Sequence, residues 1–176
     1  IALPKLMLVF HTSTAVLQWL VTGYMLVIGI VLPLSSLIAK WFTTRQIVIF
    51  ALLDFIIGAA ISALAPNFAV LLAGRMIQGI GTGLILPLMF TIAMQIFQPK
   101  KIGSIMGICA LVIMFAPAIG PTLTGLILAK LSWRWIFWSF EIFLVIALCL
   151  AVTALENIGQ PTRRHIDLLS IIESVL

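Results

Sequence analysis

Residues 71–83 read Leu71-Leu72-Ala73-Gly74-Arg75-Met76-Ile77-Gln78-Gly79-Ile80-Gly81-Thr82-Gly83, which places an arginine inside a long apolar run. An ionised side chain inside a lipid bilayer costs several kcal/mol unless it is paired or wetted. Gln78 and Thr82 follow Arg75 at three and seven positions, so the three side chains share one face of a helix. This spacing predicts a membrane helix whose polar stripe lines an aqueous cavity.

An alternative is that Arg75 extends outward along its aliphatic stem to the lipid headgroups. That alternative accounts for neither Gln78 nor the glycines beside it. Gly79 and Gly83 lie four positions apart, a spacing that lets the backbone of a neighbouring helix approach closely. We therefore favour the cavity-lining interpretation.

The composition of the chain as a whole supports a membrane protein. Of its 176 residues, 63% are hydrophobic and 9% are charged, whereas a soluble domain carries roughly 25% charged residues. This excludes soluble domains, nucleic-acid modules, disulfide-rich secreted domains and disordered tails. A helix needs about 20 apolar residues to cross the hydrocarbon core. We predict an all-α membrane protein with five complete spans, at about residues 16–39, 47–65, 69–97, 102–129 and 135–155.

The placement of basic residues orients these spans. Short connections make neighbouring spans antiparallel, and basic residues at alternate connections fall into two sets. The larger set is Lys40, Arg45, Lys100, Lys101, Arg163 and Arg164, and the smaller is Lys5, Lys130 and Arg134. Cytoplasmic loops carry an excess of Lys and Arg, so we expect the larger set in the cytoplasm. Trp133 and Trp135, at one outer connection, and Trp41, at an inner one, are typical of an aromatic belt at the membrane interface.

The span at 102–129 carries a specific cluster of small and helix-bending residues: Gly107, Pro117, Gly120, Pro121 and Gly125. Each proline removes a backbone donor, and its ring crowds the carbonyl four residues earlier. We expect the two prolines to bend or locally loosen this helix. Ala116 and Gly120, four positions apart, predict a tightly packed face.

The span at 16–39 has a comparable pattern. Gln18 and Thr22 lie near one helical face, and Pro33 lies about two-thirds along the span. Pro121 occupies a similar place three spans later, in a span of opposite sense. Paired interruptions in inverted three-helix units are typical of alternating-access transporters. We expect Gln18 and Thr22 to line the same cavity as Gln78 and Thr82.

Two carboxyl groups also fall inside the spans. Asp54 and Glu141 are either hydrogen-bonded or snorkelling structural groups, or they handle protons. The sequence lacks the phosphate-cradling Gly-x4-Gly-Lys-Ser/Thr pattern and the common hydrolase and zinc motifs. We therefore predict no enzymatic activity, no cofactor and no metal, and expect an ion gradient as the energy source.

Four runs of this sequence match a known family in order and spacing. They are residues 18–26, 71–83, 116–125 and 133–137. With them, the chain resembles the major facilitator superfamily over its whole length. Within that superfamily it is similar to the fourteen-helix drug:proton antiporters of the EmrB/QacA type, in particular their lincomycin-efflux-like group.

The resemblance implies specific roles. Arg75 occupies the position of the family's membrane arginine, which serves proton coupling. Gly107, Gly120, Pro121 and Gly125 occupy the antiporter signature of the fifth helix, which includes Pro117 in this chain. The complete spans would be helices two to six. Residues 1–176 would then form one membrane domain, part of an N-terminal six-helix half truncated at both ends, with partial helices at 1–10 and from Asp167 onward.

The function expected from these observations is secondary active transport in the cell membrane. The transporter would export hydrophobic or amphipathic drug-like compounds in exchange for protons. Its partners would be those small molecules, protons, the lipid bilayer and the remaining helices of a longer transporter, with no nucleic acid. The alternatives are a truncated, non-transporting membrane fragment or subunit, and a metabolite carrier of the same superfamily.

Overall fold

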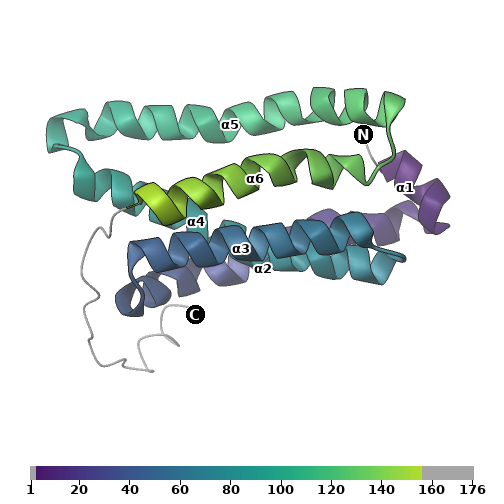
Figure 1. The fold of residues 1–176 in the computed structure, drawn as a ribbon, viewed down its shortest axis with the longest axis horizontal. Helices are drawn as coiled ribbons and strands as arrows, with labels where there is room; N and C mark the ends of the chain where they lie inside the picture. The colour runs from purple at the N-terminus through teal and green to yellow at the C-terminus, as the bar shows by residue number, and fades with distance from the viewer. Residues whose placement is uncertain (1–2, 156–176) are drawn as a thin grey trace.

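A computed structural model describes residues 3–155, and within that range the chain forms six α-helices and no strand (Figure 1). Five of these helices are long and apolar enough to cross a membrane. The helices are α1 (Leu3–Phe10), α2 (Thr14–Trp41), α3 (Thr44–Leu64), α4 (Phe68–Ile96), α5 (Pro99–Lys130) and α6 (Trp135–Ala154). The predicted all-α membrane fold is confirmed, and the five predicted spans lie within a few residues of α2 to α6. Arg163, Arg164 and the span expected from Asp167 lie outside the described residues.

Short polar side chains cap the starts of α2, α3 and α4, whereas the starts of α5 and α6 have no side-chain cap. Asn67 Oδ1 accepts the Val70 N–H at 3.0 Å and caps α4. Thr43 and Gln46 form a reciprocal capping box at the start of α3. These bonds satisfy backbone donors that have no partner inside the helix. The connections between the described spans are only two to four residues long.

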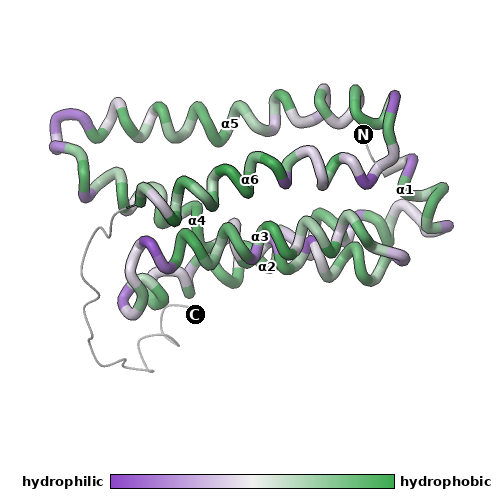
Figure 2. Tube along the Cα trace, in the orientation of Figure 1, coloured by the Kyte–Doolittle hydropathy of each residue, from purple (hydrophilic) through white to green (hydrophobic). Residues whose placement is uncertain are grey.

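The connections gather at the two ends of the bundle, and most of the hydrophilic residues gather with them (Figures 1 and 2). The α2–α3 and α4–α5 connections, with their basic residues, lie at one end. The α1–α2, α3–α4 and α5–α6 connections lie at the other. This confirms the predicted alternation of the spans. Which end faces the cytoplasm stays a prediction from the positive-inside rule.

Basic side chains also tie the ends of helices together. Lys5 Nζ donates to the Leu128 carbonyl at 2.8 Å, near the end of α5. Arg134 donates to the Ala65 carbonyl at 3.2 Å, just after α3. Carbonyls at a helix C-terminus lack intrahelical partners and carry partial negative charge. These cations therefore stabilise helix ends as well as contributing to topology.

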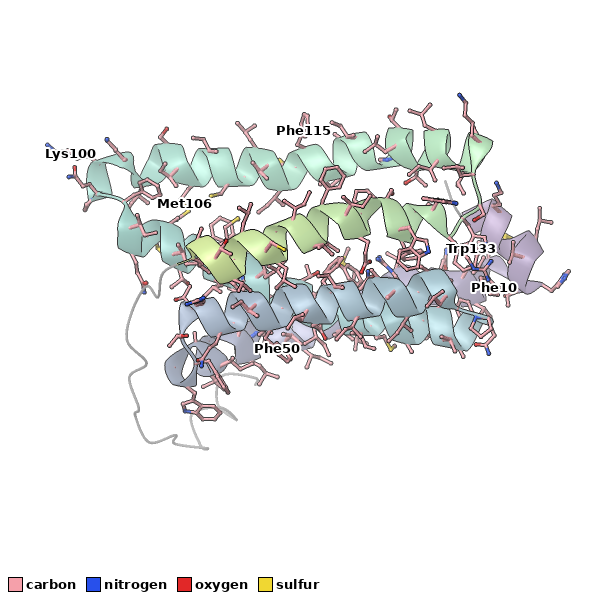
Figure 3. All side chains as sticks on the ribbon, viewed as in Figure 1. Phe10, Phe50, Lys100, Met106, Phe115 and Trp133 are labelled. Carbon is pink, nitrogen blue, oxygen red and sulfur yellow. The ribbon has the colours of Figure 1, made fainter. Side chains whose placement is uncertain are left out.

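Trp133 does not belong to an interfacial belt, which corrects the sequence-based expectation. Its side chain is only 4% exposed and packs with Leu6, Leu17, Leu20, Ala65 and Leu71. Its ring meets Phe10 edge-on at 5.4 Å between centroids (Figure 3). Trp135 is 49% exposed, as a belt residue would be. The α5–α6 connection folds inward at Trp133 because this apolar cluster accepts the indole.

Glycines on α4 permit close packing against α2 on one face. A Cβ at Gly79 would lie 3.1 Å from the Tyr24 carbonyl oxygen, and one at Gly83 would lie 2.8 Å from Val31 Cβ. This confirms the close approach predicted from the Gly79 and Gly83 spacing, and α2 is the helix that approaches.

A second face of α4 packs just as closely against α3. A Cβ at Gly74 would lie 2.8 Å from the Gly58 carbonyl oxygen, and one at Gly81 would lie 2.6 Å from the Ala51 carbonyl oxygen. α4 is therefore held between two helices at backbone separations that only glycine allows.

α5 contributes no buried residue to the described part of the chain. Its helix continues without interruption through Pro117 and Pro121, so the predicted loosening does not break it. A Cβ at Gly107, Gly120 or Gly125 would meet nothing within 4 Å. The tight packing expected around Gly120 is thus not made within residues 3–155. Phe115, on the same helix, projects away from the bundle (Figure 3).

The close packing generates a stability prediction. Gly81→Ala places a methyl group against the Ala51 carbonyl and should destabilise the protein by about 1–3 kcal/mol. Gly29→Ala is the matched control, because a Cβ there meets nothing within 4 Å. The control should leave stability unchanged or raise it by up to about 1 kcal/mol. Denaturant unfolding of the purified protein in detergent measures both. Equal stabilities would contradict the close α3–α4 contact.

Candidate functional site

Four polar side chains of α2 and α4 form a connected group, the Arg75 cluster, made of Tyr24, Arg75, Gln78 and Thr82. Arg75 Nη1 donates to Gln78 Oε1 at 3.0 Å. The guanidinium carbon lies 4.4 Å from the centroid of the Tyr24 ring. Thr82 Oγ1 donates to the Gln78 carbonyl at 3.1 Å and lies 2.9 Å from the Tyr24 hydroxyl oxygen. Because a threonine hydroxyl has one proton, the Tyr24 hydroxyl is the donor in that last bond.

Arg75 is directed into the protein. It lies seven residues after Phe68, the first residue of α4, which at 1.5 Å per residue is about 10 Å along the helix. Its hydrogen bond to Gln78, a residue only 2% exposed, holds the guanidinium among α4, α2 and the cavities described next. The structure therefore does not have the outward, snorkelling arrangement that was the alternative for Arg75.

Two cavities, both open to the outside of the described bundle, border Arg75. One, of about 370 Å³, lies between Arg75 and the helices α1, α5 and α6. Its walls include Leu6, Pro121 and Trp133. The other, of about 560 Å³, lies between α3, α4 and α6 and is lined by Gln78 and by Phe55, Phe137, Phe140 and Phe143. The walls are mostly apolar, so a charge there is felt more strongly than it would be in water.

The structure brings together some of the predicted cavity-lining residues but not all of them. Gln78 and Thr82 join Arg75, as their spacing on one helix predicts. Gln18 and Thr22 are exposed on α2. They face away from the side of α2 that packs against α4, and neither lines the two cavities beside Arg75. Their place in a transport cavity stays a prediction.

Of the predicted antiporter-motif residues, Pro121 lines a cavity beside Arg75, together with Thr124 of the same helix. Gly107, Pro117, Gly120 and Gly125 are not part of the walls of the two cavities. In the described part of the chain, Pro121 is the motif residue that shares a cavity wall with Arg75. The motif's role in transport stays a prediction.

The two intramembrane carboxyl groups differ in their surroundings. Asp54 Oδ2 accepts the Gly81 N–H at 2.8 Å, so this side chain joins α3 to α4. This favours the hydrogen-bonded structural role for Asp54. Glu141 Oε2 is buried and has no hydrogen-bond partner among the described residues. For Glu141, the structure leaves both predicted roles open.

Tyr24 is the member of the Arg75 cluster that the site prediction did not include. It is the only tyrosine in the chain. A phenol inside an apolar span needs a hydrogen-bond partner, and this requirement was the available signal. The sequence does not say which helix supplies the partner, because that depends on how α2 is turned toward α4.

Five membrane-length helices around a guanidinium held inside the bundle define a multi-pass integral membrane protein of the cell membrane. The chain belongs to the Major Facilitator Superfamily, whose family model matches residues 1–168.

Named relatives are similar over most or all of this chain. It is 51% identical over 176 residues to the lincomycin resistance protein LmrB of Bacillus subtilis (strain 168), covering 100% of this chain and 37% of that relative. It is 50% identical to the lincomycin resistance protein LmrB of Listeria monocytogenes, covering 99% of this chain and 37% of that relative. A multidrug resistance protein B homolog of Mycobacterium tuberculosis is 35% identical, covering 73% of this chain and 24% of that relative. The chain thus spans about 37% of the length of these two LmrB relatives.

The Asp54 contact gives a prediction that separates its two roles. In Asp54→Asn, the amide oxygen still accepts the Gly81 N–H, so stability and activity should be retained. In Asp54→Leu, that acceptor is lost, and the protein should be destabilised by about 1–3 kcal/mol. Thermal unfolding in detergent measures the stability of both variants, and an assay of the expected transport measures their activity. An inactive but fully stable Asp54→Asn protein would instead assign proton handling to Asp54.

Proposed function

We propose that this chain is part of a secondary active transporter that exports hydrophobic or amphipathic drug-like compounds in exchange for protons. The observation that carries the proposal is the Arg75 cluster, a guanidinium held inside a membrane-length helix beside two cavities. The names of the relatives, lincomycin resistance protein and multidrug resistance protein, support drug-like substrates.

Arginine suits a coupling role because it stays protonated and carries five N–H donors in a planar fork. One of these donors binds Gln78 in the structure. The remaining donors are available to a carboxylate or to a polar group of the substrate. An ionised acid facing Arg75 would be held by charge attraction, and a proton arriving on that acid would release it.

We place the proton-carrying acid on a further helix of a longer transporter, since neither Asp54 nor Glu141 is ion-paired with Arg75 in the described part of the chain. Within residues 3–155, Arg75 forms no ion pair, and Asp54 is bonded to the backbone of α4 on its α3 face. Further helices of a longer transporter would supply the acid and would cover α5, whose residues are all at least partly exposed. The lipid bilayer and protons are the other partners of this proposal.

The proposal predicts that Arg75 is required for proton-driven export. Arg75→Ala, made in the full-length transporter, should lower efflux at least about tenfold, since removing one partner of a buried charge interaction costs more than the ~1.4 kcal/mol that a tenfold change represents. Accumulation of labelled lincomycin in cells, with and without a protonophore, measures this. Lys100→Ala, at an exposed helix end, is the matched loss of a positive charge and should leave efflux unchanged.

Two results would contradict the proposal. If the protonophore leaves efflux by the unmodified transporter intact, the export is not proton-driven. If Arg75→Ala protein inserts normally and exports lincomycin at the original rate, Arg75 takes no part in coupling. Quantitative blotting of membranes establishes that the variants are present in equal amounts.

A further inference from the structure

Tyr24 is the aromatic side chain that contacts the Arg75 guanidinium. The guanidinium carbon lies 4.4 Å from the centroid of its ring. A cation within about 6 Å of an aromatic ring, over its face, is attracted by the electron density of that face. This attraction strengthens where water is excluded.

Few groups other than the Tyr24 ring contact the Arg75 guanidinium in the described part of the chain. In the described part of the chain, Arg75 bonds to Gln78 Oε1 and forms no ion pair. The amide oxygen of Gln78 and the Tyr24 ring are therefore the electron-rich groups that face the guanidinium here. Both are uncharged, so they hold the cation more weakly than a carboxylate would.

The position of the ring is fixed by two contacts with α4. The Tyr24 hydroxyl bonds to Thr82 Oγ1 at 2.9 Å, which orients the far end of the ring. The backbone carbonyl oxygen of Tyr24 lies 3.1 Å from the position that a Cβ on Gly79 would take. Because the Tyr24 backbone and hydroxyl both contact α4, the position of the ring face depends on where α2 lies relative to α4.

We propose that Tyr24 is a positioning residue of the transporter: the face of its ring holds the Arg75 guanidinium while the acid that pairs with Arg75 is protonated. The position of α2 thereby determines the position of the Arg75 guanidinium. The aromatic ring carries this role, and the hydroxyl only orients the ring. This inference rests on the proposed function, because it assigns a task within the same proton-coupled cycle.

Graded substitutions in the full-length transporter test the role of the ring. Tyr24→Phe keeps the ring face and loses the bond to Thr82, whereas Tyr24→Leu loses both. We expect Tyr24→Leu to lower maximal lincomycin efflux about tenfold with the substrate KM within about twofold, and Tyr24→Phe to stay within about threefold of the original rate. The pH of half-maximal efflux should move in Tyr24→Leu and stay in place in Tyr24→Phe. A merely structural role would not move that pH.

Several outcomes would overturn the inference. Tyr24→Leu protein with the original efflux rate and pH profile would show that the ring is dispensable. Equal losses in Tyr24→Phe and Tyr24→Leu would assign the role to the hydroxyl. If Tyr24→Leu fails to reach the membrane, Tyr24→Met, unbranched and apolar, is judged by the same criteria. Arg75→Ala, measured in parallel, separates the two proposals: if it exports normally the proposed function fails, and if it is inactive while Tyr24→Leu is normal only the positioning role fails.

Discussion

The arrangement of this bundle depends on the close contact of α4 with two other helices through glycine. Within lipid, an apolar side chain gains little by leaving acyl chains for another helix, so association relies on close van der Waals contact and on hydrogen bonds. Gly79 and Gly83 provide that contact toward α2, and Gly74 and Gly81 provide it toward α3. One face of α4 thus packs against α2 and a second against α3. The face that carries Arg75 lies between these two and borders the cavities.

The Arg75 cluster is tolerated in the membrane because its members bond to one another. Gln78 offers its side-chain oxygen to Arg75 and its carbonyl oxygen to Thr82, and Thr82 receives the Tyr24 hydroxyl. Polar groups in hydrocarbon without partners are costly, so a closed set of this kind favours one orientation of α2 on α4. Asp54 likewise has a partner at the α3–α4 interface, where its carboxylate accepts a backbone N–H of α4.

The second half of the described chain contrasts with the first. α2, α3 and α4 bury glycines against each other, whereas a Cβ added at any glycine of α5 would meet nothing within 4 Å among the described residues. α5 nevertheless approaches the Arg75 cluster at Pro121 and Thr124, across one of the two cavities. Since the LmrB relatives are much longer than this chain, the open side of α5 is where the proposed transporter would place further helices.

The amino-acid sequence by itself determined the number of spans, their alternation, and the shared face of Arg75, Gln78 and Thr82. These features depend on the length of apolar runs and on helical spacing, which are local properties. The spacing of Gly79 and Gly83 likewise predicted the close approach of a neighbouring helix, but it did not identify that helix.

Only the tertiary structure decided which side chains of different helices meet. It joined Tyr24 to the cluster, left Gln18 and Thr22 on the far side of α2, and buried Trp133 among leucines. The physical reason is that these helices are apolar on nearly every face. Hydropathy therefore does not fix how each one is turned about its axis, and the contacts with neighbouring helices do.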